Sequence, residues 1–475
     1  MAQSPAGHSQ QSPGVHPQRL SGEQSRGPFG GQPQRPAQRG DDYGARRAGT
    51  SSDLRTRNLA ALARAVHNGG GGRTRAELTR NLGLARGTAA VLAAELAARE
   101  LIQEQPGQGG TRGLPTGIAG RHPRGPVAIA VDLRDESWVI AAGELGGGLA
   151  VLDERAHQAR PAGRVLEALA DMIAARTTAA GIARRVIGVA VALPATIGNG
   201  RILQAVHLGW PQLDVAGALR AALDVESGGA TPAASTGTAA ENAAREIAAI
   251  DSDLPGSGLF AAGNDATLAG LAEARRGRLR GASAGLHLHA SLGIGGVLIT
   301  GGRLVTGALG AVGEFGHMPL ASTDLACPCG SRGCWDLEVG ANALLRHAGM
   351  QAPPGTRIAA AEQIIYRAED GDPVCTRAVG SCAAALGRGA AALVNAHDPE
   401  IVTLSGLAIA LANAAPTVLH DAYLAGLMQF RQADPPPLRT SELAVPGPLI
   451  GAAELLFDEF LTTDGLDWWE QRSRG

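Results

Sequence analysis

Three cysteines and one histidine lie close together in the second half of the chain and could form a metal site. Cys327, Cys329 and Cys334 fall within eight residues, and His317 lies ten residues before the first of them. Thiolates and a neutral imidazole are preferred ligands of zinc, and a Cys3His set fills its tetrahedral shell. Because no position is left for a reacting water, the residue types predict a structural Zn²⁺ site rather than a catalytic one.

Two other interpretations of this cluster remain open. The cysteines could be free or redox-active thiols, or the segment could be a zinc finger that reads DNA. A DNA-reading finger is disfavoured because the cluster lies in an acidic part of the chain and no basic helix follows it. The other two cysteines, Cys375 and Cys382, are seven residues apart in an Ala-rich stretch, and we expect both to be buried as small apolar side chains.

The segments around the cluster alternate between strand-like and helix-like patterns. Short apolar runs predict strands, and longer Ala-rich or amphipathic stretches predict helices. The predicted strands are 127–133, 138–145, 149–155, 186–193, 259–262, 286–292, 297–300 and 401–405, and the predicted helices are 164–179 and 375–396. Strands that alternate with helices indicate an α/β fold for residues 125–465.

The N-terminal part of the chain is basic, whereas the rest is acidic. Residues 1–125 carry 17 Arg against 8 Asp and Glu, and residues 126–475 carry 25 Arg against 36 acidic residues. The chain has no Lys, which excludes any mechanism that needs a catalytic lysine. A basic region ahead of an acidic body indicates that the N-terminal part meets a polyanion.

Residues 51–124 have the pattern of three short helices followed by a β-hairpin. Apolar residues at helical spacing, Leu59 and Leu62 among them, precede a run of four glycines. The pattern Thr74-x-x-Glu77 then predicts a capping box that opens a second helix. Three helices with a glycine turn and a following hairpin are typical of a winged helix-turn-helix domain.

The third predicted helix covers 86–99 and has Val91, Leu92 and Leu96 on its apolar side. As a recognition helix it would enter the major groove, with the wing over 102–113 beside it. The alternative is a small helical interaction domain with a solvated arginine face. The residues expected at base edges or phosphates lie at the start of this helix, beside it or at the wing tip: Arg73, Arg75, Arg80, Arg86, Gly87, Thr88 and Arg112.

Length and composition exclude several classes of protein. The 475 residues contain no run of about 18 apolar residues, so we expect no transmembrane helix. The polar N-terminus lacks the apolar core of a secretory signal, and five cysteines argue against a disulfide framework, which predicts a cytoplasmic protein. We expect residues 1–50 to be a disordered tail and residues 224–258 to be a partly mobile insertion.

Motifs in the acidic body resemble the signature of the ROK family, which groups repressors, open reading frames and sugar kinases. The zinc segment reads Gly-Glu-Phe-Gly-His-Met-Pro-Leu at 313–320 and Cys-Pro-Cys-Gly-Ser-Arg-Gly-Cys-Trp-Asp at 327–336. Further motifs follow in the family's order at 209–210, 263–266, 291–296, 398–402 and 451–453. The resemblance covers residues 127–460 and implies an actin-like ATPase fold of two α/β lobes around a cleft. The winged helix resembles that of the family's repressor branch.

The resemblance also implies roles for five residues. In ROK sugar kinases the Asp of an Asn-Asp pair is the general base that activates the sugar hydroxyl, and here that position is Asp265. Asn264, Glu314 and His317 match residues that hydrogen-bond the sugar, and Asp336 stands where the family has Glu. His317 would serve both the zinc ion and the sugar. Solvated loop charge is the alternative interpretation of the three carboxylates.

The sequence departs from the kinases mainly where they hold ATP. The kinase pattern Asp-x-Gly-Gly-Thr becomes Asp-Leu-Arg-Asp-Glu-Ser at 132–137, so side chains occupy the place of phosphate-binding amides. Leu292 replaces a Thr of the second phosphate loop, and Ser-Gly-Leu at 405–407 replaces a glycine pair. Ala195 replaces the Gly of the sugar-side turn, and Ala85 replaces a Ser before the recognition helix, which removes a side-chain cap. These departures predict a cleft that has lost ATP but retains a sugar.

The sequence therefore predicts a multi-domain protein: a winged helix-turn-helix domain, then a two-lobed α/β actin-like fold with a structural zinc loop at 313–338. The predicted function is a sugar-responsive DNA-binding regulator without kinase activity and without a membrane partner. It would be a repressor, acting as a dimer or tetramer, that a monosaccharide or its derivative releases from operator DNA. One alternative is a ROK sugar kinase that uses ATP, with Asp265 as general base. Another is a constitutive DNA-binding protein with a vestigial cleft.

Overall fold

The computed structural model describes residues 51–106, 117–135, 137–157, 161–226, 258–443 and 446–474. Residues 51–475 belong to one compact unit. The predicted tail over 1–50, the wing tip that carries Arg112 and most of the insertion over 224–258 lie outside the described residues.

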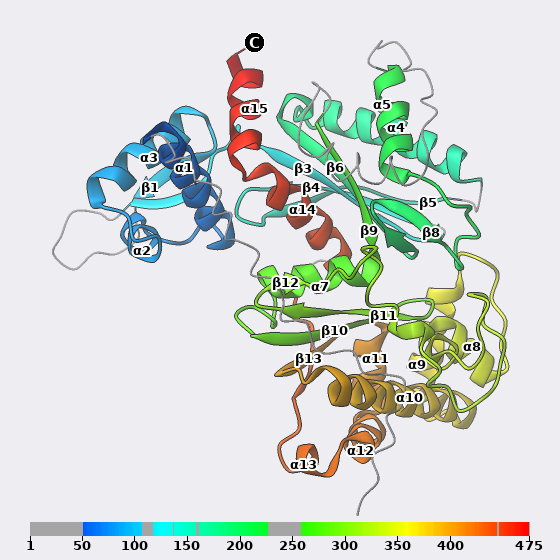
Figure 1. Cartoon of the computed structure of the whole chain (residues 1–475). Helices are drawn as coiled ribbons and strands as arrows, with labels where there is room; N and C mark the ends of the chain where they lie inside the picture. The colour runs from blue at the N-terminus through cyan, green and yellow to red at the C-terminus, as the bar shows by residue number, and fades with distance from the viewer. Residues whose placement is uncertain are drawn as a thin grey trace, which may run out of the picture. The chain divides into compact units, whose positions relative to one another are not determined.

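Residues 51–121 form three helices and a two-stranded hairpin, which we call the helical head (Figure 1). Its elements are α1 Ser51–Asn68, α2 Arg75–Asn81, α3 Arg86–Ala98, β1 Ile102–Pro106 and β2 Gly117–Arg121. The predicted capping box is present: the Thr74 hydroxyl accepts from the Glu77 amide, and the Glu77 carboxylate accepts from the Thr74 amide. α3 begins after Ala85 without a side-chain cap, as its sequence indicated.

The assignment of Val91 to the apolar side of α3 is wrong. Leu92 and Leu96 are buried in the head, but the Val91 side chain is 54% exposed. Arg86 and Thr88 are exposed as well, so Val91 lies with them on the solvent-facing side of α3.

The body contains two five-stranded sheets with the same topology. The first has the order β5-β4-β3-β6-β9 and the second the order β12-β11-β10-β13-β14. In each sheet the first three strands in chain order pair antiparallel with their neighbours. The last two strands then pair in parallel on the free edge of the first strand. The strands are β3 Val127–Leu133, β4 Ser137–Glu144, β5 Leu149–Ala156, β6 Val186–Leu193, β9 Leu259–Asn264, β10 Ala284–Ala290, β11 Ile294–Thr300, β12 Arg303–Leu304, β13 Ile401–Gly406 and β14 Leu438–Thr440. A small hairpin of β7 Thr196–Gly198 and β8 Arg201–Gln204 follows β6.

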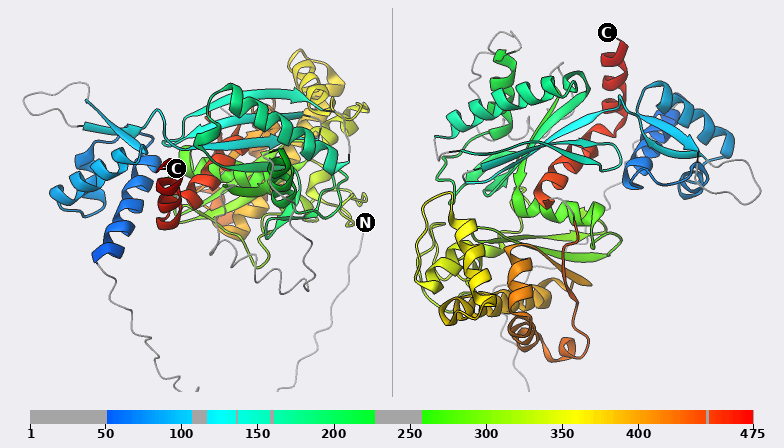
Figure 2. Two further views of the ribbon diagram at one scale, coloured as in Figure 1. Left: turned by 90° about the horizontal axis from the view of Figure 1, so that it is seen from above. Right: turned by 180° about the vertical axis from the view of Figure 1, so that it is seen from behind.

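Helices cover both faces of each sheet, as buried parallel strands require. α4 Ala162–Ala179 and α5 Val215–Glu226 pack on one face of the first sheet, and α14 Gly447–Phe460 packs on the other. α7 Asp265–Arg276 lies beside α14, between the two sheets (Figures 1 and 2). The far face of the second sheet carries α8 Ala341–Ala348, α9 Arg357–Glu369, α10 Pro373–His397, α11 Leu407–Ala414 and α12 Pro416–Gly426.

Two short segments complete the chain. α13 Gln429–Gln432 precedes β14, and α15 Thr463–Arg474 ends the chain against the helical head. Cys375 and Cys382 are buried in α10, as predicted. Among the described residues, no helix combines the length and the hydropathy needed to cross a membrane.

Candidate functional site

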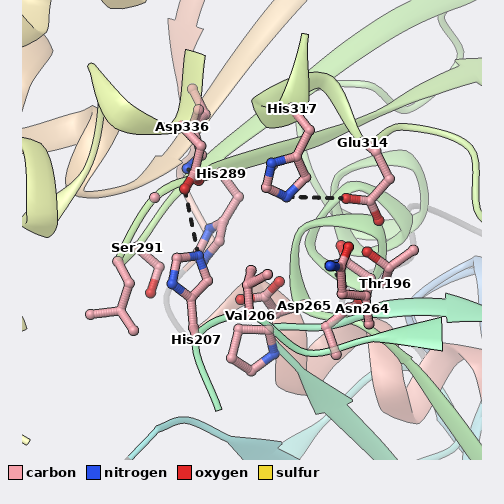
Figure 3. A pocket seen from close by; sticks show the side chains of 17 residues that line it. Thr196, Val206, His207, Asn264, Asp265, His289, Ser291, Glu314, His317 and Asp336 are labelled. Atoms are coloured by element: carbon pink, nitrogen blue, oxygen red, sulfur yellow. Dashed lines mark hydrogen bonds and ion pairs between the residues drawn. The ribbon is translucent and has the colours of Figure 1, made fainter. Parts of the chain in front are cut away.

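The five residues predicted to bind a sugar line a single pocket between the lobes. Asn264, Asp265, Glu314, His317 and Asp336 all contribute to its wall (Figure 3). They come from the junction of β9 and α7 and from the segment over 313–338, so the fold brings together groups that are far apart in the sequence. The pocket is narrow, with an open volume of about 60 Å³.

The Asn264–Asp265 pair is held by the start of α7. Asn264 is the N-cap residue, and its side-chain oxygen accepts from the Thr267 amide at 2.9 Å. Its amide nitrogen donates to the Ala195 carbonyl at 3.1 Å, which ties the cap to the turn after β6. Asp265 accepts from the Ala266 amide through Oδ1. Capping fixes the direction of both side chains, because a strand that passes directly into a helix leaves little freedom at the junction.

Glu314 and His317 lie on opposite ends of one helical turn, η2 Phe315–His317 with its N-cap. His317 Nε2 is 3.9 Å from Glu314 Oε2, and both side chains face the pocket (Figure 3). Burial raises the pKa of Glu314, although a hydrogen bond from Thr196 and the neighbouring His317 oppose the rise. A carboxyl that hydrogen-bonds Thr196 and faces a small polar cavity is suited to accept from a ligand hydroxyl.

The predicted metal ligands form a compact cluster. The ligand atoms of His317, Cys327, Cys329 and Cys334 all lie within 4.8 Å of one another. Cys327 Sγ is 3.7 Å from His317 Nδ1, and Cys329 Sγ is 3.6 Å from Cys334 Sγ. Bonds of about 2.3 Å from zinc to sulfur place tetrahedral ligands about 3.8 Å apart, so the donor set and its spacing fit this ion.

The cluster leaves the second ring nitrogen of His317 for the pocket. Nδ1 faces the cysteines, whereas Nε2 faces Glu314. Without a metal, burial raises the pKa of the Cys327 thiol to about 12, so a metal ion would have to displace its proton. A ligand at this cluster would therefore fix both the loop and the imidazole that borders the pocket.

Asp336 is fixed by the backbone of the second sheet, and His207 lies opposite it. Asp336 Oδ1 accepts from the Ile294 amide at 3.0 Å, and its other oxygen is 3.7 Å from His207 Nε2 (Figure 3). Gly293 makes room for this carboxylate, because a Cβ there would be 1.7 Å from Oδ1. His207 was not among the predicted site residues; it follows Ala205 in the loop between β8 and α5. The only signal for it in the sequence is its position just before the motif at 209–210.

Further polar residues that line the pocket were not predicted, among them Thr196, Gln204 and His289. Thr196 and Gln204 come from the β7–β8 hairpin, and Gln204 donates to the Cys329 carbonyl at 3.1 Å. His289 lies at the end of β10, where its Nδ1 is 2.8 Å from the Ser405 hydroxyl. Ser405 Oγ is also 2.9 Å from Nε2 of the buried His287, whose pKa burial lowers to about 3. The neutral imidazole of His287 is thus linked through the Ser405 hydroxyl to His289 at the pocket wall.

A second, larger cavity of about 710 Å³ adjoins the pocket on the other side of Asp265 and His289. It lies where the resemblance places ATP. Its wall includes the segment after β3, the start of α9 and the Ser405-Gly406-Leu407 turn after β13.

Two ion pairs fill the predicted phosphate end of this cavity. Arg134 forms a fork on Asp132 Oδ2, with its Nε and Nη2 at 2.9 and 2.8 Å. Asp135 accepts from Arg357 Nη2 at 2.5 Å, which joins the turn after β3 to α9 of the other lobe. The Asp135 carboxylate is therefore paired. Side chains that form ion pairs with each other therefore occupy the positions where the kinase pattern has backbone amides that bind phosphate.

Most of the predicted DNA-contacting residues that the structure describes are accessible to solvent. Arg80, Arg86, Gly87 and Thr88 are exposed, and Arg73 is half-buried. The side chain of Arg75 and all of Arg112 lie outside the described residues. The exposed start of α3 thus presents a cation, a hydroxyl and the methyl groups of Val91.

The fold and the pocket define the class: a two-lobed α/β protein of actin-like topology with a polar interlobe site. A family profile described as the ROK family matches residues 259–459, and the chain therefore contains a ROK family domain.

Curated relatives of this chain include enzymes and regulators. The glucokinase of Streptomyces coelicolor is 30% identical over 157 residues, which are 30% of this chain and 50% of that protein. The xylose repressor of Bacillus subtilis is 28% identical over 178 residues, which are 37% of this chain and 44% of that protein. The chain thus matches half or less of the length of these relatives.

Solved structures share the fold. A ROK family transcriptional regulator, described as a homologue of the E. coli MLC protein, aligns with a TM-score of 0.64 at 20% identity and covers 88% of this chain and 99% of its own. A ROK glucokinase from Streptomyces griseus, solved with glucose and AMPPNP, aligns with a TM-score of 0.53 at 21% identity and covers 69% of this chain and 98% of its own. Residues 125–475 make up less than three quarters of the chain, so the match to the regulator extends into the N-terminal part.

Proposed function

We propose that this chain is a DNA-binding transcriptional regulator, a repressor that a monosaccharide or its derivative releases from operator DNA. The observation that carries the proposal is the contrast within the cleft. The sugar pocket keeps its carboxylates, amide and imidazoles around an open space, whereas the ATP end is occupied by the Arg134–Asp132 and Arg357–Asp135 ion pairs.

The helical head supports DNA binding. A short helix that opens with Arg86, follows a tight turn and precedes a hairpin has the order of elements of a winged helix-turn-helix domain. Arg86 and Thr88 would meet base edges, Val91 would contact a thymine methyl group, and Arg73, Arg75, Arg80 and Arg112 would lie near phosphates or the minor groove. A dimer or tetramer would place two such helices on a pseudo-palindromic operator.

The pocket supports an effector rather than a substrate. Asn264, Asp265, Glu314, His317 and Asp336 would bind the hydroxyls of the sugar, and Zn²⁺ held by His317 and the three cysteines would keep one wall in place. Asp265 occupies the position of a general base, but in our proposal it serves only as a binding group, because paired side chains take the place of the phosphate-binding amides in the adjoining cavity.

Binding to DNA from upstream of the chain's own gene tests the proposal. Fluorescence anisotropy would be measured across a salt titration, with and without a panel of monosaccharides. We expect tight, salt-dependent binding that one sugar weakens about 5- to 150-fold, the range of an ordinary coupling free energy. Absence of binding at low salt would contradict the DNA-binding part, and binding that no sugar alters would favour a vestigial cleft.

A sugar kinase is the second candidate, because glucokinases are among the relatives and Asp265 lies in the pocket. It predicts ATP consumption in the presence of glucose that disappears in Asp265→Asn. We expect no sugar-dependent consumption from the wild-type chain, and turnover of this kind would replace our proposal with the kinase.

A further inference from the structure

The helix that begins at the sugar pocket ends at the helical head. α7 opens with Asp265 in the pocket wall and closes with Arg276, about 16 Å away along the helix axis at 1.5 Å per residue. Its body is buried between the two sheets and against α14. Gly451 of α14 lies so close that a Cβ there would be 1.9 Å from the Leu268 carbonyl oxygen. A helix packed this tightly moves as a rigid element.

Arg276 joins three elements at its end of α7. Its Nε donates to Glu454 of α14 at 2.7 Å, and its Nη1 donates to the His67 carbonyl at the end of α1 at 2.8 Å. Gly147, in the β4–β5 turn, makes room for the guanidinium, because a Cβ there would be 2.6 Å from Nε. One side chain therefore contacts the sugar-bearing helix, the helix beside it and the head.

The contact between α7, α14 and α1, which we call the joint, also contains the side chains of His67 and Glu454. His67 Nδ1 accepts from the Gly146 amide at 3.0 Å, and its Nε2 lies 3.0 Å from the Glu454 carboxylate and 2.8 Å from Arg276 Nη2. Both side chains are only 2% exposed. Burial acts to raise the pKa of Glu454, but the hydrogen bond from His67 and the charge of Arg276 outweigh it and lower the pKa. The carboxylate is therefore ionised and paired.

Arginines also cap the two helices that meet at this joint. The last carbonyls of a helix have no partner within it and carry partial negative charge. Arg276 and Arg280 donate to the His67 and Asn68 carbonyls of α1, and Arg64 of α1 donates in return to the Asp458 and Leu461 carbonyls at the end of α14. The contact is reciprocal, so α1 follows a displacement of α14 or α7.

The position of α7 in the pocket wall supplies the displacement. Asn264 and Asp265, at the start of α7, line the pocket together with Glu314 of the opposite segment, so a sugar bound to both sides contacts α7 directly. Drawing the two sides onto one ligand would shift the start of α7.

We propose that Arg276 is a positioning residue that transmits sugar binding from α7 to the helical head. This inference rests on the proposed function, since it assigns the route by which the effector changes DNA affinity. Arg276 itself touches neither sugar nor DNA in this proposal; it sets the pose of α1 relative to the pocket, and only a difference between the two poses changes affinity.

The test compares Arg276→Gln with Arg278→Gln. Arg278 lies just beyond the same end of α7, but it contacts Thr440 and Glu442 of the body and leaves the head untouched. D-glucose and D-xylose serve as probes, and thermal shift verifies folding and sugar binding in each variant. We expect the sugar to weaken operator binding 5- to 150-fold in the wild type and Arg278→Gln, but less than about threefold in Arg276→Gln. Wild-type coupling in Arg276→Gln would overturn the inference.

A second readout does not depend on DNA. Hydrogen exchange of the Gly69 and Gly70 amides, which bond to carbonyls of α1, reports the state of the joint. We expect the sugar to change their exchange in the wild type but not in Arg276→Gln. A response of exchange without any DNA binding would reject only the proposed function, whereas sugar binding without a response of exchange would reject the route through Arg276. Arg276→Lys keeps a positive charge beside Glu454 and serves as the second variant if Arg276→Gln does not fold. We expect sugar to weaken its operator binding by an amount between those of the wild type and of a chain without coupling.

Discussion

The two ends of the interlobe cleft differ in how their charged groups are satisfied. At the sugar end, Asp336 has one oxygen fixed by a backbone amide and the other turned towards the cavity. At the other end, Arg134 and Arg357 are committed to neighbouring carboxylates. The larger cavity therefore lines its phosphate end with arginines that are already paired. The difference between the two ends shows that unpaired polar groups, more than the volume of a cavity, indicate which site can bind a ligand.

Removing a ligand from the cluster of His317 and three cysteines is expected to have the largest effect on the proposed sugar pocket. Cys334→Ser is expected to lose the metal and to lower the free energy of unfolding by at least about 3 kcal/mol, because the loop loses its central crosslink. Sugar binding should disappear with it, since His317 belongs to the cluster and Asp336 follows Cys334 by two residues. Metal content and thermal unfolding measure both effects. Cys382→Ala, a buried cysteine outside the cluster, should keep the metal; equal metal loss there would contradict the assignment.

Asp265 tests whether the pocket binds through its carboxylates. Asp265→Asn keeps the shape but removes the charge, and a hydrogen bond to a charged group contributes about 1.5–3 kcal/mol. We expect the sugar affinity to fall about 10- to 100-fold while operator affinity without sugar stays unchanged. Isothermal titration and anisotropy give the two numbers. Glu362→Gln, which lines only the larger cavity, is the matched control and should leave sugar affinity within about twofold.

His287 predicts how stability responds to acid. Its pKa of about 3 in the fold lies below the ordinary value of 6.5, so the unfolded chain takes up a proton first as the pH falls. Stability is full above pH 6.5 and is lost between pH 6.5 and pH 3, by about 1.4 kcal/mol per unit. Urea unfolding at pH 7 and pH 5 should show a difference of about 2 kcal/mol from this residue. An unchanged pH dependence in His287→Asn would show that another group causes it.

Reopening the phosphate end should have the smallest effect. Arg134→Gly with Asp135→Gly removes both ion pairs and restores glycines to the turn after β3. We expect the wild type to show no thermal shift with MgATP and the double variant to show a weak one, because the second loop still carries Leu292. Sugar affinity should change by less than about twofold, since neither residue lines the sugar pocket. Tight ATP binding by the wild type would contradict the comparison.

Local patterns predicted much of the fold, and long-range contacts account for what was missed. Strands β3 and β6 have the predicted bounds, because each is a continuous apolar run that is buried on both faces. α7 was not predicted, because its sequence mixes alanines with charged residues and one of these, Glu273, is buried. The hydrogen-bond partners of the Glu273 carboxylate are the Ser441 hydroxyl and the Arg278 amide, and only the folded structure identifies them.

The site shows the same limit. The motifs placed the predicted sugar-binding and metal-binding residues in one region, and the fold brings these residues together around one pocket and the adjoining cluster. The Asp135–Arg357 pair joins residues 222 positions apart, and no local pattern marks Arg357. Val91 was misassigned because α3 has apolar or small residues on both sides, so periodicity alone did not distinguish its buried face from its exposed one.

The contact between α15 and α3 bears on how such proteins can be recombined. Trp469 of α15 donates to the Arg99 carbonyl at 2.8 Å, and Arg99 pairs with Glu470. The head is thus braced by the last helix of the chain, although the whole body lies between them in sequence. A chimera that exchanges the head at residue 124 would separate these partners. An engineered exchange of DNA specificity would need to carry α15 with the head, or to graft only the exposed face of α3.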